Sequence, residues 1–186
     1  MGIVRLGRIL SFVGALAPPA FAFQTQALVG FGLYTYEPVC GETCLRSFSG
    51  YMLDCTVMAH GGDGMMMGMT STSPECYGNN TAFLTSVAYC MSTKCPEWNV
   101  RASKLEVMWE EQITGHLYIV PKWTYGEALA HVNPVPPKYQ LTSNDTSLNV
   151  TSLVDPKVYT AQWNILETVY KGSILESALR YDPNHP

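Results

Sequence analysis

The sequence predicts a mainly α-helical fold: a small disulfide-stapled domain with long glycosylated and methionine-rich loops. Apolar residues recur at helical spacing in several segments, which favours helices over strands. The six cysteines are even in number and all lie between residues 40 and 95, as expected of a disulfide framework. The helical segments are separated by polar stretches with glycosylation sequons and by one segment rich in methionine and glycine.

Residues 1–22 are predicted to form a secretory signal peptide. Arg5 and Arg8 make a short basic region, residues 9–17 are apolar, and Ala20 and Ala22 provide the small residues of a cleavage site. An uncleaved anchor or a buried helix is the alternative, but the apolar run is short for a membrane span. No later stretch is long and apolar enough to suggest a transmembrane helix. The expected location is therefore the secretory pathway and then the cell exterior or the cell surface.

Cleavage after Ala22 would leave enough chain for one domain with a real core. It removes two arginines and no acidic residue, which leaves 9 basic and 15 acidic residues and a net charge of −6. This balance argues against nucleic acid and against an anionic membrane surface as partners.

Two of the predicted helices carry cysteines. The first begins near Pro38, a residue suited to a first helical turn. The second begins at Asn80 or Thr81, either of which can cap it, and ends before Pro96. The residues expected on their inner faces are Cys40, Cys44 and Phe48 in the first helix, and Phe83, Val87 and Cys90 in the second.

The cysteine spacing favours disulfides over a zinc site, because the gaps fit no zinc-finger pattern. Six cysteines allow fifteen connectivities. If the two cysteine-containing helices pack antiparallel, Cys40 would pair with Cys95 and Cys44 with Cys90. This would leave Cys55 to pair with Cys76.

Three more helices are predicted in the C-terminal half. They cover residues 99–113, about 124–131 between flanking prolines, and 155 to about 181, where Asp155 caps the helix and Pro156 fits its first turn. Residues 138–154 are expected to be a polar glycosylated loop. The predicted apolar faces comprise Val100, Leu105, Met108, Trp109 and Ile113 in the first of these helices, and Val158, Ile165, Leu166 and Val169 in the last.

Three sequons predict N-glycosylation at Asn79, Asn144 and Asn149. Each lies in polar, turn-rich sequence, which suits an exposed acceptor. Together with the signal peptide, they support export of the chain.

No catalytic residue is predicted. The chain has no H-E-x-x-H, G-x-S-x-G or P-loop motif. Glu110 and Glu111 are adjacent, so on a helix they point about a hundred degrees apart and cannot face each other. The four histidines, His60, His116, His131 and His185, are scattered along the chain, and His116 and His131 are expected to have structural or surface roles.

The segment "MAHGGDGMMMGM", residues 58–69, is the one candidate metal site, and we call it the methionine loop. It holds five methionines, one histidine and four glycines. Thioether sulfur is a soft ligand with no proton to lose, so it suits Cu(I), and imidazole can bind Cu(I) or Cu(II). The alternative is a flexible insertion of low complexity whose methionines bind nothing. The candidate ligands are Met58, His60, Met65, Met66, Met67 and Met69.

A family resemblance is carried by four blocks: "SPECYGNNTAFLTSVAYCMSTKC", "KLEVMWEEQITG", "KWTYGEALAHVNPVPP" and "VYTAQWNILETVY". They resemble the extracellular N-terminal region of fungal ferric reductase transmembrane components. On this resemblance, residues 23–181 are expected to form the exoplasmic domain, and residues 182–186 a tail outside the family pattern. The resemblance implies a role in iron and copper reduction and uptake at the plasma membrane. Copper ions, iron ions and a membrane domain would be the partners.

The family's membrane and cytosolic parts bind haem, FAD and NADPH, and no position of this chain matches those binding residues. Where the membrane helices of the family would follow, the sequence reads "DPNHP". The expectation is therefore a truncated ferric or cupric reductase-like protein that has no redox activity of its own. It would be either an incorrect gene model or a natural short form. A free secreted copper-binding or cell-surface glycoprotein is the alternative, and a secreted structural domain is a third reading.

Overall fold

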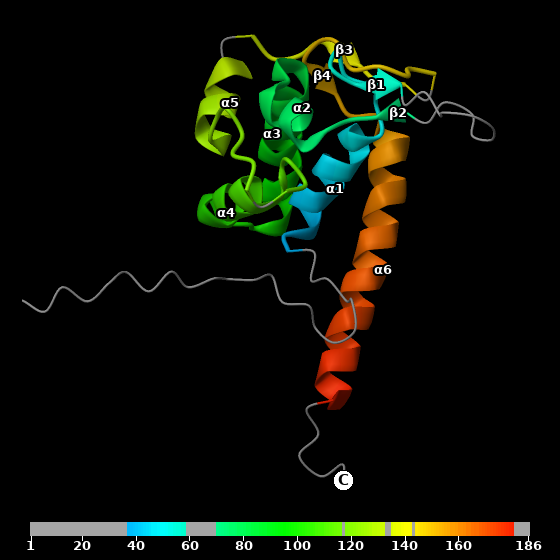
Figure 1. The fold of residues 1–186 in the computed structure, drawn as a ribbon. Helices are drawn as coiled ribbons and strands as arrows, with labels where there is room; N and C mark the ends of the chain where they lie inside the picture. Colours follow the sequence, from blue (N-terminus) through cyan, green and yellow to red (C-terminus); the bar gives the residue numbers. More distant parts are fainter. Residues whose placement is uncertain (1–36, 59–69, 117, 133–134, 143, 181–186) are drawn as a thin grey trace, which may run out of the picture.

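The computed structural model describes residues 37–58, 70–116, 118–132, 135–142 and 144–180. In that part of the chain the predicted mainly helical, disulfide-stapled fold is confirmed, and each strand is only two residues long (Figure 1). The predicted signal peptide and the predicted tail, residues 182–186, lie outside the described residues.

Helix α3 (Thr81–Lys94) lies at the centre of the fold. It packs against α1 (Val39–Ser49), the short helix α2 (Pro74–Asn79) and α5 (Tyr125–Val132). All seven residues from 82 to 88 are buried, so α3 is covered on every side rather than on one face.

Two disulfides fasten α1 to α3 and to the 3-10 helix η1 (Cys95–Trp98) that continues it. They join Cys40 to Cys95 and Cys44 to Cys90, so α1 and α3 run antiparallel. The third disulfide joins Cys55 to Cys76. These are the three pairs that the antiparallel arrangement predicts.

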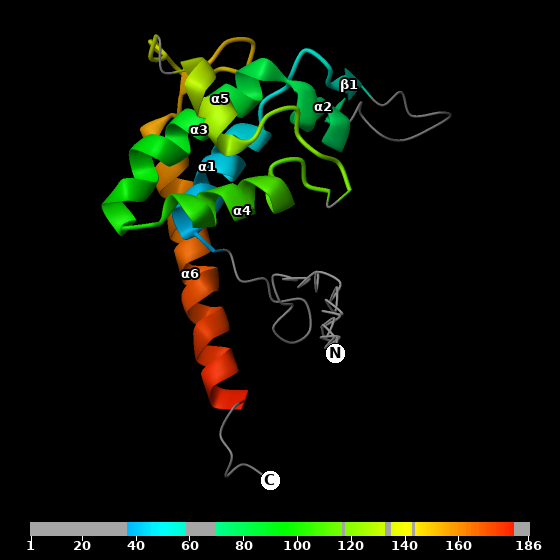
Figure 2. The ribbon, with the colours of Figure 1, turned by 90° about the vertical axis from the view of Figure 1, so that its left-hand side faces the viewer.

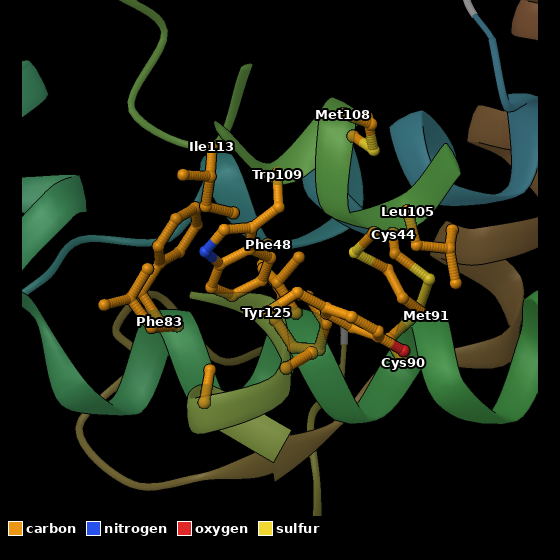
Figure 3. Packing of buried hydrophobic residues seen from close by; sticks show 14 of the residues in the cluster. Cys44, Phe48, Phe83, Cys90, Met91, Leu105, Met108, Trp109, Ile113 and Tyr125 are labelled. Carbon is orange, nitrogen blue, oxygen red and sulfur yellow. A yellow bond between two sulfur atoms is a disulfide. The ribbon is translucent and has the colours of Figure 1, made fainter. Parts of the chain in front are cut away.

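Helix α4 (Ala102–Gln112) closes the core from below in the view of Figure 1. Its buried side chain Trp109 lies beside Phe48 of α1 in Figure 3, and Met108 and Phe83 belong to the same buried cluster. The Trp109 Nε1–H donates to the backbone carbonyl of Trp123 at 2.8 Å, which satisfies the indole of a fully buried ring.

The approach of Met108 in α4 to α1 depends on a glycine. A Cβ atom at Gly41 would lie 2.6 Å from Met108 Sδ, well inside contact distance. Because Met108 is itself buried, it has little room to move away.

Helix α6 (Pro156–Arg180) packs along α1 and then extends beyond the body (Figures 1 and 2). Asp155 caps it as predicted: the Lys157 N–H donates to Asp155 Oδ1 at 2.8 Å. The predicted apolar stripe is wrong for Ile165 and Val169, which are 53% and 37% exposed, whereas Leu166 is buried. The side of the helix turned toward the core instead carries Tyr159, Trp163 and Leu166.

The segment from 138 to 154, predicted as a loop, is attached to the helices at several points. The Leu148 N–H donates to the Met52 carbonyl at 2.9 Å, and the Ser152 N–H donates to Ser86 Oγ at 2.8 Å. Leu148 is buried, so the segment also contributes to the core. Its two short strands, which pair in parallel, are β3 (Tyr139–Gln140) and β4 (Ser152–Leu153).

Candidate functional site: the stem of the methionine loop

The ends of the methionine loop are held together by a short hairpin stem. Strand β1 (Val57–Met58) pairs antiparallel with β2 (Thr70–Ser71), with Met58 opposite Thr70. One step below, the Thr56 and Thr72 hydroxyls hydrogen-bond at 2.8 Å, and below them the Cys55–Cys76 disulfide closes the base. We define the stem as residues 55–58 and 70–76.

The stem depends on its disulfide more than on its strands. A two-residue ladder is too short to be stable alone, since even complete two-stranded hairpins are marginal in water. The disulfide closes a loop with a sequence separation of 21 residues and restricts the chain before the ladder forms. The eleven residues from 59 to 69 therefore leave and rejoin the body at one point.

Of the predicted copper ligands, only Met58 belongs to the described residues. It lies on β1 and is 65% exposed. His60, Met65, Met66, Met67 and Met69 lie outside the described residues. Within the part of the chain that the structure does describe, no group of three or more His, Cys, Asp or Glu side chains is arranged to hold a metal ion.

A cavity of about 420 Å³ lies beside the base of the stem. Asp54 and Cys55 line one side, and Leu148 and Asn149 approach from the segment before β4. Asn80 Nδ2 donates to Asp54 Oδ1 at 2.7 Å and so joins the residue just before the stem to the start of α3. The remaining lining residues are Asn79, Thr81 and Ala82.

The three sequon asparagines are all exposed on the surface. Asn79 ends α2, where its Nδ2 donates to the Glu75 carbonyl at 2.9 Å, and Asn149 Nδ2 donates to Ser147 Oγ at 3.2 Å. Asn144 lies in the 138–154 segment. Each side-chain amide is thus accessible for attachment of a glycan, and Asn79 and Asn149 border the same cavity.

His116 and His131, which were expected to have structural or surface roles, each contact a neighbouring residue. The His131 ring stacks on Trp123 with centroids 4.0 Å apart, and His116 Nδ1 accepts a hydrogen bond from the Tyr118 N–H at 3.3 Å. Partial burial and the neighbouring Glu110 carboxylate raise the pKa of Glu111.

An aromatic groove was not predicted from the sequence. It has a volume of about 670 Å³ and opens between η1, the start of α4 and α6. Trp98 stacks on Trp163 with ring centroids 4.4 Å apart and remains 54% exposed. At the same groove Glu37 accepts a hydrogen bond from the Tyr170 hydroxyl at 2.7 Å and pairs with Lys104 at 3.5 Å. The two tryptophans are far apart in the sequence, and no spacing rule brings them together.

Three disulfides are typical of proteins from an oxidising, secretory environment. Among the described helices, none is both long and apolar enough to span a bilayer. Comparison of the chain with protein-family models, with curated proteins and with solved structures finds no match in any of the three. Function must therefore be inferred from the chemistry of the chain's own residues.

Proposed function

We propose that this chain is the exoplasmic domain of a ferric or cupric reductase-like membrane protein and that its methionine loop binds Cu(I). The observation that carries the proposal is the disulfide-closed stem, which brings both ends of a segment with five thioethers and one imidazole to one point on the surface. The domain has no redox step of its own in this proposal. It takes up the reduced metal ion that such a protein produces.

The sequence blocks that carry the family resemblance support the reductase part of the proposal. They correspond to α2 with α3, to α4, to α5 and to the first part of α6. The resemblance thus involves the helices that build the core and not one surface motif.

The position of the stem supports binding rather than reduction at the loop. In Figures 1 and 2 the stem lies at the end of the body opposite to the projecting end of α6. A helix of 25 residues is about 37 Å long. If α6 leads toward a membrane domain, the stem faces the exterior, on the side of metal ions rather than of haem.

A Cu(I) titration of the secreted chain against a competing chelator tests the proposal. Replacing Met65, Met66, Met67 and Met69 together by leucine removes the soft donors at similar side-chain volume. We expect the affinity for Cu(I) to fall by at least about tenfold, which corresponds to roughly 1.4 kcal/mol. Because thioethers carry no proton, the wild-type affinity should persist at acidic pH apart from the share contributed by His60.

Met52→Leu is the matched control, since Met52 lies on the body outside the loop. It should leave the affinity unchanged. Equal affinities for the quadruple variant and the wild type would eliminate the copper site.

The reductase part needs a separate test. Sequencing of the spliced transcript downstream of the codon for Pro186 distinguishes it from a free secreted copper-binding glycoprotein. Reading in frame into apolar spans supports the reductase. A stop codon at that point, with the chain recovered from the medium, supports the secreted glycoprotein.

A further inference from the structure

The three disulfides differ in their access to solvent. The four cysteines that join α1 to α3 and η1 are almost completely buried, with exposed fractions of 3% or less. In the third disulfide Cys76 is buried at 6%, but Cys55 is exposed. A reagent in solution can therefore approach this disulfide from the side of Cys55 without any opening of the core.

The cavity beside the stem provides the approach. Cys55 is one of the residues that line its volume of about 420 Å³, which is within the range of sites for small molecules. Its lining is mixed: Ala82 and Leu148 are apolar, and Asp54, Asn79, Thr81 and Asn149 provide polar groups. A small hydrophilic molecule can enter such a space without losing all its hydrogen bonds.

We infer that Cys55–Cys76 is a site of thiol–disulfide exchange, at which a small thiol enters this cavity and attacks Cys55. The thiolate of the reductant forms a bond to Cys55 Sγ as the Cys55–Cys76 bond breaks, and Cys76 leaves as a thiolate that takes a proton from water. A second molecule of the thiol, as its thiolate, then attacks the small-molecule sulfur of this mixed disulfide, and Cys55 leaves as a thiolate that takes a proton from water. The two small thiols supply two electrons and leave as their own disulfide, and both cysteines end as thiols.

Reduction at this site releases the stem and leaves the core linked. Without the disulfide, the stem retains the two residue pairs of β1 with β2 and the bond between the Thr56 and Thr72 hydroxyls. The disulfides Cys40–Cys95 and Cys44–Cys90 still hold α1 to α3. The exchange therefore removes the covalent link of the stem while the helical core stays cross-linked. This inference stands without copper binding.

Timed alkylation of the intact chain, produced through a secretory pathway, tests the inference. The native protein is incubated with reduced glutathione, quenched with N-ethylmaleimide at intervals, and mapped by proteolysis and mass spectrometry. We expect Cys55 and Cys76 to become labelled at least about a hundredfold faster than the other four cysteines, because those need an opening of the core. Labelling of all six at similar rates, or of none before denaturant is added, would overturn the inference.

Two substitutions of Asn149 test whether the thiol reaches Cys55 through the cavity. Asn149→Trp and Asn149→Gln both remove the sequon, but only tryptophan adds bulk at the edge of the cavity. The tryptophan variant should react with glutathione several-fold more slowly than the glutamine variant. Identical rates would show that thiols do not enter through the cavity, and circular dichroism checks that both variants remain folded.

Discussion

Asn80 connects three parts of the molecule through its side chain and its own backbone N–H. Its Oδ1 accepts a hydrogen bond from the Phe83 N–H at 2.7 Å and so caps α3. Its Nδ2 donates to Asp54 in the stem region, and its own N–H donates to the Cys76 carbonyl at the end of α2. The side chain is almost fully buried, so water cannot replace these partners without cost.

Two substitutions of Asn80 distinguish the contribution of the helix cap from that of the hydrogen bond to Asp54. Asn80→Ala should lower the free energy of unfolding by about 2 kcal/mol, because it loses both the cap and a buried hydrogen bond. Asn80→Ser keeps an oxygen for the cap and should lose only about half as much. Urea denaturation measures the difference. The Asn79 sequon is intact in both variants, so glycosylation does not confuse the comparison.

If the serine variant is as unstable as the alanine variant, the cap is not the stabilising contact.

At the scale of the elements, spacing and capping signals predicted each helix of two turns or more in the described part of the chain. Helix α2 was missed because six residues are too few for a periodic pattern. Its signals are nevertheless present, since Ser73 Oγ accepts from the Cys76 N–H and Pro74 starts the helix. The apolar face predicted for α6 was wrong at Ile165 and Val169 because it was chosen from aliphatic residues alone. The aromatic side chains of Tyr159 and Trp163 pack against the core instead.

The candidate site was only partly predictable. The sequence identified the thioethers and the cysteine pair at the base of the loop from residue types and order. It gave no sign of the cavity, because Cys55, Ala82 and Leu148 come from three distant segments. The two-residue strands of the stem are likewise shorter than any pattern of alternation can reveal.

The contact between α6 and the start of α1 should depend on pH. The hydrogen bond from Tyr170 and the charge of Lys104 lower the pKa of Glu37 below its ordinary value of 4.5. Glu37 therefore stabilises the fold above about pH 4.5, and this contribution is lost as the pH falls through the lowered pKa.

Tyr170→Phe should accordingly reduce stability at neutral pH, and the difference from wild type should shrink in acid. Denaturation across a pH series measures it, with the exposed Tyr118→Phe as the control. A difference that is constant with pH would contradict the role of Glu37.

At the scale of the whole molecule, the two ends of the body carry different elements. The stem and the segment from 138 to 154 lie at one end, and α6 projects from the other (Figures 1 and 2). All three sequon asparagines are exposed, so glycans would spread over the surface around the stem and leave the packed helices unaffected.

Glycans are expected at Asn79, Asn144 and Asn149 of the secreted chain. Enzymatic deglycosylation in heavy-oxygen water should convert each to a labelled aspartate that mass spectrometry detects. Thr146→Ala should abolish the label at Asn144 alone, and Thr146→Ser, which keeps the sequon, should preserve it. Unmodified asparagine at all three positions would contradict export through the secretory pathway.

The arrangement of the disulfides has a further consequence. Each one joins a cysteine before residue 59 to a cysteine after residue 69, so all three span the methionine loop. A protease that cuts between Met58 and Thr70 would produce two polypeptides that remain one covalent particle. On a gel without reductant such a nicked protein would migrate as an uncut one, and only the addition of reductant would separate the fragments.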